Sequence, residues 1–344
     1  MSAGHPMSTD RREVIRQTYE QTRSVAETMR LTGHSKAAVW KYGKRVVEAT
    51  ALDPVVVATF DGKSQPGVQA SAALAPHVSP RLPDPAPEAG GPQFPEPLEL
   101  DYQPFRMAAP GTYLILSDCH IPYHDRATIQ LAIEEARRRQ VVGVLLNGDI
   151  LDCAELSDHE RDVDAIDLAD EITLGRQLVA WIRSRLPAAR LVMKQGNHEA
   201  RLHRVILRDA PALMGIEGVD MPSFLKLADY GVEWVADQRI VTLGKLNVIH
   251  GNEYRGSGGV NPARWLYLKA RSVALCGHFH RSSEHHSRDI GDNHEAAWSV
   301  GCACHLHPRW LRLNDWNLGF AFVSVEADGW FVVENKRVLN GRVV

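Results

Sequence analysis

The stretch Tyr113-Leu-Ile-Leu-Ser-Asp118-Cys-His120 is a short apolar run that ends in polar side chains able to bind a metal ion. The same pattern recurs in Gly143-Val-Leu-Leu-Asn-Gly-Asp149, Arg190-Leu-Val-Met-Lys-Gln-Gly-Asn197-His198, Leu246-Asn-Val-Ile-His250-Gly251 and Val273-Ala-Leu-Cys-Gly-His278-Phe-His280. An apolar run of this length, bounded by Gly and polar residues, is typical of a buried strand. Because strands of an open α/β sheet present their carboxyl ends along one edge, we expect these side chains to converge there.

The polar side chains that follow these runs are Asp, Asn and His, and the set needs no thiolate. Carboxylate, amide and imidazole groups in combination suit divalent first-row metal ions. The sequence therefore predicts a centre for a pair of such ions at the strand ends.

The chain has 344 residues, of which 44% are hydrophobic and 24% are charged, as is ordinary for a soluble globular protein. This length allows two domains, or one large domain with an accessory one. The net charge of -3 says little about partners when it is averaged over the chain. No apolar stretch approaches the roughly 20 residues needed to cross a bilayer, and segment 1–12 lacks the apolar core of a signal peptide. We therefore expect a cytoplasmic protein without membrane association.

Cysteine usage favours reduced thiols. The five cysteines are an odd number and lie beside or within the expected strands. Cys302 and Cys304 could form half of a metal site, but no partner pair accompanies them. Cys119, between two candidate ligands, is expected to point away from them and to pack in the core.

A proline-rich segment divides the chain. Residues 64–97 hold nine prolines, many small residues and almost no large apolar side chains. Such a segment cannot bury enough surface to offset its chain entropy. We expect a flexible linker over 51–107 that separates an N-terminal unit, 8–50, from a larger unit, 108–344.

The N-terminal unit has the signals of three short helices. We expect the first from Thr9-Asp10 to about Thr22, and the second after Ser24 as its N-cap, with Val25, Met29 and Leu31 facing inward. A break follows at Thr32-Gly33-His34, and Ser35 would cap a third helix carrying Val39 and Tyr42. This is helix–turn–helix spacing.

The same unit is basic. Residues 1–50 carry nine Lys/Arg and five Asp/Glu, so the net charge is 9 − 5 = +4. Lys36, Lys41, Lys44 and Arg45 crowd the third helix around Trp40. The prediction is a DNA-binding unit, in which these four cations contact DNA and which could pair as a homodimer. The alternative is a small interaction or oligomerisation unit with a solvated basic face.

The larger unit alternates strands with helices, which are expected at Arg126–Arg139, Asp167–Arg185 and Glu199–Arg208. This alternation indicates a substantially parallel core sheet. Toward the end of the chain, 296–302, 319–326 and 329–334 are expected as strands of a second, more antiparallel sheet, with a turn at Ala327-Asp328-Gly329. The expected fold class is α/β, a two-sheet sandwich flanked by helices, plus the small all-α N-terminal domain.

Five polar blocks occur in order over about residues 111–281: Asp118-x-His120, Gly148-Asp149-x-x-Asp152, Gly196-Asn197-His198-Glu199, His250-Gly251 and Gly277-His278-x-His280. In this order, the region 108–344 resembles the calcineurin-like metallophosphoesterases. The resemblance implies a two-sheet sandwich and hydrolysis of phosphate esters by a pair of metal ions that share a hydroxide.

The resemblance also implies roles for individual residues. Asp149 would bridge the two ions, with Asp118, His120 and His280 completing one site and Asn197, His250 and His278 the other. The glycines before Asp149, Asn197 and His278 would permit tight turns at the strand ends. Mn²⁺ is the first choice of metal, with Fe, Zn²⁺ or Mg²⁺ as alternatives.

His198 is not a ligand in the family and resembles the general acid that protonates the leaving oxygen. Asp152 would orient it. Read without the resemblance, Asp152 could instead be a helix N-cap, and Glu199 could be a helix-start carboxylate. Among the other histidines, His159, His305 and His307 are the candidates to approach a substrate.

The substrate class is inferred from two arginines that this chain lacks near the polar blocks. The phosphoprotein phosphatase branch has an Arg soon after the second block and another just before the Asn-His pair. This chain has Gly148-Asp-Ile-Leu-Asp-Cys-Ala154 and Gln195 at those places, although Arg201 could supply one nearby. A phosphodiester needs less clamping than a dianionic monoester, so the prediction is a phosphodiesterase or nuclease directed to DNA. The alternatives are a phosphomonoesterase acting on a nucleotide or phosphoprotein, and a DNA-binding protein whose metal domain is structural or inactive.

Overall fold

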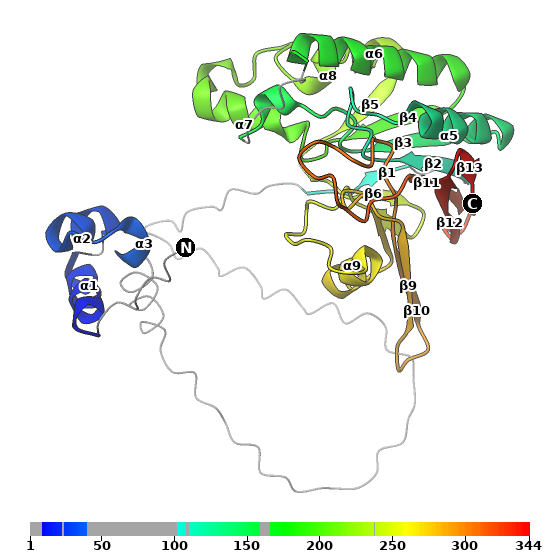
Figure 1. Cartoon of the computed structure of the whole chain (residues 1–344). Coiled ribbons are helices and arrows are strands. Elements are labelled where there is room, and N and C mark those ends of the chain that lie inside the picture. Colours follow the sequence, from blue (N-terminus) through cyan, green and yellow to red (C-terminus); the bar gives the residue numbers. More distant parts are fainter. Residues whose placement is uncertain (1–8, 23, 40–101, 108–109, 159–165, 237) are drawn as a thin grey trace, which may run out of the picture. The chain divides into compact units, whose positions relative to one another are not determined.

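The computed structural model describes residues 9–22, 24–39, 102–107, 110–158, 166–236 and 238–344. The chain divides into two compact units, Met1–Gln93 and Phe94–Val344, drawn in Figure 1. Most of the predicted linker lies outside the described residues. Its predicted end at residue 107 is too late, because Phe105–Arg106 already forms strand β1 and pairs with a strand of the second unit.

The first unit contains helices α1 (Thr9–Thr22), α2 (Val25–Thr32) and α3 (Lys36–Val39). Ser24 caps α2 by accepting the N–H of Glu27, and Gly33 ends α2 at φ 65°. Ile15, Tyr19 and Val39 form a small buried core. Leu31, expected to face inward, is 55% exposed, and the residue of α2 that is buried is Thr28.

Helix–turn–helix function and DNA contact remain predictions for this unit. Lys36 begins α3, whereas Lys41, Lys44 and Arg45 lie outside the described residues.

Two sheets form the centre of the second unit, counted over the described residues. The larger has the order β13-β12-β11-β2-β3-β4-β5 and the smaller the order β1-β6-β7-β8-β10-β9. The strands of the larger sheet are β2 (Gly111–Leu116), β3 (Gly143–Asn147), β4 (Arg190–Lys194), β5 (Val232–Val235), β11 (Gly319–Val325), β12 (Phe331–Leu339) and β13 (Arg342–Val343). Those added in the smaller sheet are β6 (Val241–Leu243), β7 (Leu246–Val248), β8 (Ala274–Cys276), β9 (Ser283–Arg288) and β10 (His294–Ser299).

Helices cover both outer faces of this pair of sheets. Figure 1 shows α5, α6, α7 and α8 on the side of the larger sheet and α9 beyond the smaller one. The helices are α5 (Arg126–Arg138), α6 (Leu168–Arg185), α7 (Ala200–Asp209), α8 (Met221–Phe224) and α9 (Pro262–Ala270), with 3₁₀ turns at Ala154–Leu156, Pro211–Leu213 and Leu227–Tyr230.

Strand β2 shows how the layers are held together. Leu114 and Leu116 pack in the core under the helices, while Tyr113 and Ile115 pack in the core between the sheets. Successive side chains of a strand point to opposite faces, so a strand buried on both faces must be apolar throughout. Burial of a Leu or Ile side chain stabilises the fold by about 1.5–3 kcal/mol.

The sequence assigned two strands to the wrong sheet. Residues 319–326 and 329–334 do not close a second sheet, because β11 pairs antiparallel with β2 and β12 extends the larger sheet. Only β10, near the predicted 296–302, belongs to the smaller sheet. Apolar alternation identifies a strand but not its partner. The candidate ligands consequently come from the ends of strands in two sheets and not from one edge of a single sheet.

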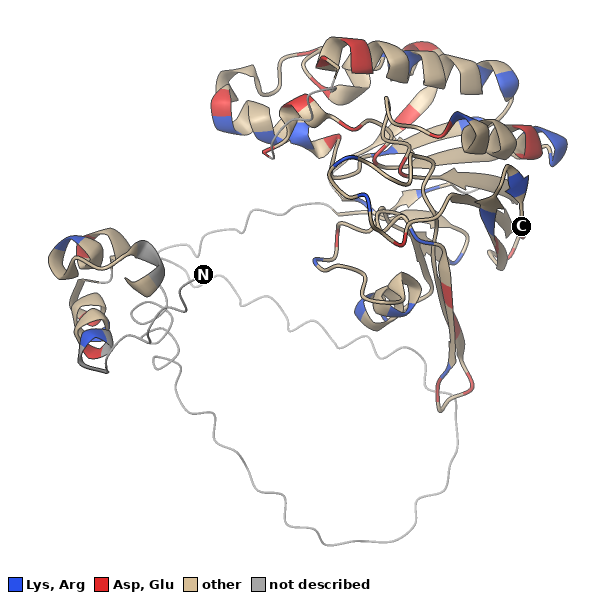
Figure 2. Cartoon of the chain, in the orientation of Figure 1, with Lys and Arg blue, Asp and Glu red and all other residues tan. Residues whose placement is uncertain are grey.

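On the helical face, Lys/Arg and Asp/Glu residues are intermixed along α5 and α6 (Figure 2). Arg185 and Arg137 pair with Glu134, and Arg139 pairs with Glu135. These cations are therefore matched by acids. Among the described residues, no helix is both long and apolar enough to cross a membrane.

Candidate metal centre

Two groups of side chains converge where the strand ends of the two sheets meet. Asp118, His120 and His280 form one group, and Asp149, His250 and His278 form the other, with the potential ligand atoms of each group within 4.8 Å of one another. The elements that carry them are β2 and β3 of the larger sheet and β7 and β8 of the smaller. The structure thus brings together six of the seven predicted ligands as two adjacent trios.

Five of these residues have a positive φ angle, a backbone conformation that residues other than Gly rarely adopt. The φ angles are 56° at Asp118, 48° at His120, 50° at Asp149, 67° at His278 and 58° at His280. Each such residue costs on the order of 1–3 kcal/mol, and such strain is typical of functional sites. The chain holds these side chains in place against local preference.

Glycines permit the close approach of the loops. A Cβ on Gly196 would lie 2.2 Å from Asp149 Oδ1, and one on Gly277 would lie 2.0 Å from Ser117 Oγ. Gly148 has φ +84° as well as a would-be Cβ contact of 2.5 Å with His250 Nδ1. The predicted need for a tight turn therefore fits Gly148, whereas Gly196 and Gly277 are required by lack of space.

Asp149 stands between the two groups. Its Oδ1 accepts the backbone N–H of His198 at 2.9 Å. Its Oδ2 lies 3.1 Å from His250 Nε2 and 3.9 Å from His120 Nε2. One carboxylate oxygen thus faces a histidine of each group, as a bridging ligand must.

Unpartnered lone pairs test whether metal ions fit. His250 Nδ1–H donates to the carbonyl of Asn147 at 2.8 Å, so in the neutral ring it is Nε2 that carries the lone pair. Within the part of the chain that the structure describes, His250 Nε2 and Asn197 Oδ1 are buried without a hydrogen-bond partner. Buried polar atoms are rarely left unsatisfied, and a cation satisfies both. Asn197 remains the predicted amide ligand of the second group.

In the first group, the spacing of the ligand atoms indicates that a cation fits. His120 Nδ1 lies 2.9 Å from Asp152 Oδ1 and donates to it, which turns the Nε2 lone pair toward His280 Nε2 at 3.1 Å. Asp118 Oδ1 lies 3.3 Å from the same nitrogen of His280. These separations suit two ligands that each lie about 2.1 Å from one cation.

The electrostatics of the cluster also favour cations. Burial raises the pKa of Asp118, but the charge of His280 outweighs it and lowers that pKa to about 2. Burial lowers the pKa of His250, but the Asp149 carboxylate outweighs it and raises that pKa to about 10. Without cations the centre therefore retains protons on histidine, and metal binding must displace them.

His198 and Asp152 lie beside this cluster and contact each other. The short contact of His198 Nδ1, 2.6 Å, is with the backbone carbonyl of Asp152, while the Asp152 carboxylate is 3.4 Å away. Asp152 serves His120 more directly than His198. The alternative of a helix N-cap is wrong, because the following 3₁₀ turn has Cys153 as its cap residue and no side-chain cap bond.

Arg201 contacts both Asp152 and His198. It donates to the carbonyl of Asp152 at 2.7 Å, and another of its nitrogens lies 3.3 Å from His198 Nε2. Burial lowers the pKa of His198, but the charge of Asp149 and the hydrogen bond with Asp152 outweigh it and raise the pKa.

Glu199 has a role that the sequence did not reveal. Its fully buried carboxylate accepts the N–H groups of Asp149, Ile150, Leu151 and Gly196 at 2.7–3.1 Å. It therefore does not merely begin a helix: it fixes the loop that carries Asp149 to the loop that carries Asn197. The sequence signal that could have indicated this role is that Glu199 directly follows Asn197-His198.

Glu253 does the same for the smaller sheet. It accepts the N–H groups of His250 at 3.0 Å and Gly251 at 2.7 Å, and it pairs with the fully buried Lys194 at 3.0 Å. Asn147 adds a cross-sheet link, because its side chain donates to the carbonyl of Ile249 at 2.9 Å. No sequence signal marked Lys194, which lies in an otherwise apolar strand.

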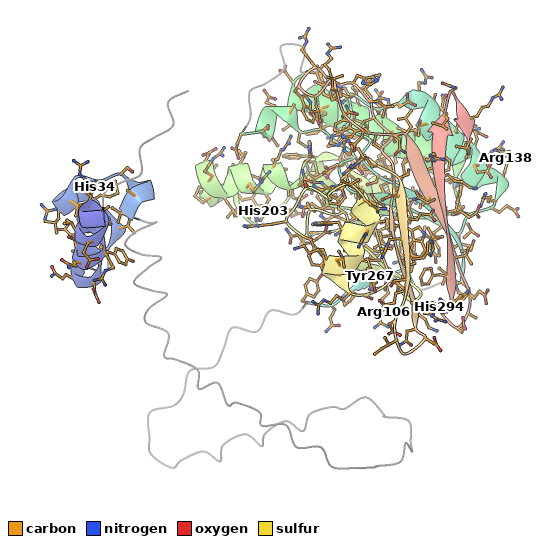
Figure 3. All side chains as sticks on the ribbon, turned by 60° about the horizontal axis from the view of Figure 1, so that its bottom comes forward. His34, Arg106, Arg138, His203, Tyr267 and His294 are labelled. Carbon is orange, nitrogen blue, oxygen red and sulfur yellow. The ribbon has the colours of Figure 1, made fainter. Side chains whose placement is uncertain are left out.

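The remaining predicted residues fall into three places. His159 lies outside the described residues, whereas His305 and His307 are exposed, with His307 Nδ1 3.0 Å from the carbonyl of Arg312. Other histidines such as His203 and His294 lie at the surface (Figure 3). Cys119 is buried in the core under the helices, as predicted.

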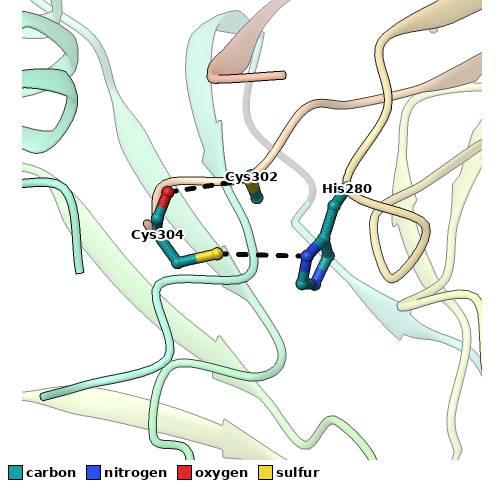
Figure 4. A group of neighbouring side chains, drawn as sticks. All are labelled: His280, Cys302 and Cys304. Atoms are coloured by element: carbon teal, nitrogen blue, oxygen red, sulfur yellow. Dashed lines mark hydrogen bonds between the residues drawn. The ribbon is translucent and has the colours of Figure 1, made fainter. Parts of the chain in front are cut away.

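The cysteine pair lies closer to the centre than the sequence suggested. All five cysteines are free thiols. Cys304 Sγ is 3.9 Å from His280 Nδ1, and Cys302 Sγ is 3.9 Å from the carbonyl of Cys304, as drawn in Figure 4. A thiol therefore lies behind one candidate ligand.

No protein-family model and no curated protein matches the sequence. Among solved structures, a single mutant of Vps29 from Entamoeba histolytica has 12% sequence identity, covers 68% of this chain and 96% of its own, and gives a TM-score of 0.37. The phosphoesterase Yfce from E. coli has 12% identity, coverages of 65% and 98% and a TM-score of 0.29. A dimetal phosphatase from Danio rerio has 11% identity, coverages of 63% and 93% and a TM-score of 0.29. Likenesses this distant assign no function, which must come from the residues of the centre.

Proposed function

We propose that this protein is a metal-dependent phosphoric ester hydrolase with two divalent cations, and that its substrates are phosphodiesters, DNA foremost. One observation carries the proposal: Asp149 Oδ2 faces both histidine groups while His250 Nε2 and Asn197 Oδ1 are buried without partners. Asp118, His120, His280 and Asp149 would hold one cation, and Asp149, Asn197, His250 and His278 the other. Mn²⁺ is the first choice, since Asp, Asn and His ligands suit several first-row ions.

When bound, such cations stabilise charge on phosphoryl oxygens and lower the pKa of water, which makes hydroxide available near neutral pH. The protein contributes the fixed positions of the ligands, through Glu199, Glu253 and Asn147. It also contributes a proton donor.

His198 is that donor. Its side chain is 16% exposed, and its Nε2 lies 3.7 Å from Asp149 Oδ2, the carboxylate that the two cations would share. The carbonyl of Asp152 fixes the ring through Nδ1. The proton passes from Nε2 to the oxygen of the departing alcohol.

The preference for diesters is supported by the residues at the two clamp positions. The stretch Gly148-Asp-Ile-Leu-Asp-Cys-Ala154 and Gln195 supply no Arg there, and Arg201 is engaged by the carbonyls of Asp152 and Cys153 at 2.7 and 3.3 Å. A basic N-terminal unit would bring phosphate-rich DNA to the centre, because Lys and Arg contacts supply most non-specific affinity.

A phosphomonoesterase is the second candidate, and Arg201 favours it. A guanidinium 3.3 Å from His198 Nε2 could turn to a dianionic monoester.

Hydrolysis of an aryl phosphodiester and of the matching aryl phosphomonoester, with Mn²⁺ and with chelator, distinguishes the candidates. We expect faster turnover of the diester, abolished by the chelator. Faster turnover of the monoester would favour the second candidate. Absence of turnover with either ester would indicate a structural or inactive metal domain.

A further inference from the structure

Helix α9 and the loop before it carry positive charge that no acid of the same segment balances. Residues 254–280 include four Lys/Arg and no Asp/Glu, and the charged residues of α9 in Figure 2 are all basic. The four cations, all exposed, are Arg255, Arg264, Lys269 and Arg271. Among the side chains that the structure describes, none of the four has an acidic partner, in contrast to the paired cations of α5. An unbalanced basic surface of this kind attracts polyanions.

The loop that carries Arg255 is fixed next to the last two candidate ligands. A Cβ on Gly258 would lie 2.6 Å from Phe279 Cδ1, so the loop packs directly on the residue between those ligands. The carbonyl of Gly259 accepts a hydrogen bond from Arg281, the residue after them, at 2.7 Å. The candidate metal centre and the exposed cation therefore share one attached segment of chain.

The N-terminal end of α9 is the end that lies next to the centre. The Trp265 ring is 5.2 Å from that of Phe279, which in turn is 5.1 Å from the ring of His278. Arg264 directly precedes Trp265. Arg271 follows the other end of the helix, about 10 Å farther along the axis at about 1.5 Å per residue. Of the cations on α9, Arg264 is therefore the nearest to the candidate ligands.

The adjacent strand β9 adds no acid at this end of α9. Ser283 Oγ accepts the N–H of Ala263 at 3.0 Å, and the His285 ring lies 4.9 Å from that of Tyr267, so β9 and α9 run in the same direction. Alternate residues of a strand share a face. Glu284, which lies between the two contacting residues, therefore points to the other face of the sheet.

One acid of the neighbouring strand β10 does share the face that α9 covers. Glu295 pairs in register with Ser287, which is on that face. Because β9 and α9 run in the same direction, Ser287 and Glu295 lie toward the C-terminal end of α9, where Arg271 is. The positive charge without a nearby acid is thus that of Arg255 and Arg264.

We propose that the nucleic-acid strand cleaved at the metal centre crosses the N-terminal end of α9, where Arg255 and Arg264 bind the phosphates beside the scissile phosphodiester. A guanidinium group can bind two phosphate oxygens at once. Two features favour this occupant over an acidic protein or an anionic membrane: the surface is attached to the loops of the candidate ligands, and the proposed substrate is itself a polyanion. The inference rests on the proposed function and names the site for its flanking phosphates.

The salt dependence of binding tests the inference without hydrolysis. For a single strand, the logarithm of the association constant falls with the logarithm of salt concentration by about 0.7 for each phosphate contact. We expect Arg255→Gln and Arg264→Gln each to make this slope shallower by about 0.7, and the double variant by about 1.4. Anisotropy of a fluorescein-labelled oligothymidylate, measured with the full-length protein and chelator over a series of NaCl concentrations, gives the slope.

Arg342→Gln is the matched control, because it removes the same charge elsewhere. Arg342 is exposed on β13, the last strand of the larger sheet, with β12 and β11 between it and β2. The slope of this variant should equal that of the wild type. An equal change in the control would show a general effect of net charge and would overturn the inference.

Hydrolysis of a small diester separates strand binding from support of the centre. Bis(p-nitrophenyl) phosphate has no flanking phosphate, so its kcat/KM should change little in Arg255→Gln/Arg264→Gln. With oligothymidylate as substrate, kcat/KM should fall about tenfold for each arginine, mostly through KM. Equal losses on both substrates would show that the arginines only support the candidate ligands, which contradicts the inference.

Unchanged salt slopes in both single variants would also overturn the inference. So would binding of labelled polyglutamate or of phosphatidylserine vesicles that depends on the two arginines while oligothymidylate binding does not, since this would assign the surface to a protein or a membrane. Should the wild type hydrolyse neither substrate, the proposed function fails. The salt slopes then decide by themselves whether a strand lies on this surface.

Discussion

Asp149 combines three features that are individually unusual. It has φ 50°, its side chain is buried, and burial is outweighed by the charges of His198 and His250, which hold its pKa well below the ordinary value. The strain, on the order of 1–3 kcal/mol, is sustained because Glu199 binds three successive N–H groups from Asp149 onward. A single carboxylate is thereby held charged and aimed between two histidine groups.

Removal of the His198 side chain should separate catalysis from metal binding. In His198→Ala we expect metal content to be unchanged, because His198 belongs to neither ligand group that the proposal uses, and kcat to fall about 10²–10⁴-fold. Metal analysis together with steady-state kinetics on the aryl diester measures both. Loss of metal in proportion to activity would make His198 a ligand instead of the acid.

At the scale of elements, β4 and the loop after β7 depend on one buried ion pair. Lys194 is fully buried on β4, donates to the carbonyl of Arg239 at 2.7 Å, and pairs with Glu253, which holds the loop of His250. A strand from the larger sheet thus stabilises a ligand loop of the smaller one.

Loss of one partner of this pair should be more damaging than loss of both. We expect Lys194→Met to lower the free energy of unfolding by about 3–5 kcal/mol, because it leaves Glu253 buried without its counter-charge. The double variant Lys194→Met/Glu253→Gln should recover part of that loss. Urea unfolding of the three proteins measures the difference, and a double variant less stable than the single one would contradict the interpretation.

Helix α6 supplies a pH-dependent element. Glu171 is buried and accepts the N–H of Cys153 at 2.6 Å, and burial raises its pKa from 4.5 to about 7. The folded protein therefore holds this proton more tightly than the unfolded chain. The resulting stability is complete below about pH 4.5 and is lost as the pH rises through about 7.

Glu171→Gln should consequently lose less stability than the wild type between about pH 5 and about pH 8. Urea unfolding at a series of pH values measures this decline. An identical decline in both proteins would assign the titration to another group.

At the scale of the whole molecule, the sequence predicted which segments are strands better than it predicted how those strands pair into sheets. The apolar runs before Asp118, Asp149 and Asn197 are strands, because residues buried on both faces must be apolar. The same pattern could not show that β11 joins β2, since Ala321 opposite Ile115 is a tertiary pairing. Likewise, motif spacing indicated the candidate ligands but not Lys194, Glu253 or Asn147, whose roles exist only once two sheets face each other.

The most direct test of the central claim is electron paramagnetic resonance of the protein titrated with Mn²⁺ after chelator treatment. Two ions bridged by Asp149 should bind per chain and give an exchange-coupled signal, as expected for metals about 3.5–4 Å apart. Asp149→Asn should abolish that coupling together with diester hydrolysis. Isolated, uncoupled Mn²⁺ in the wild type, or coupling and activity retained in Asp149→Asn, would contradict a dinuclear centre built on this residue.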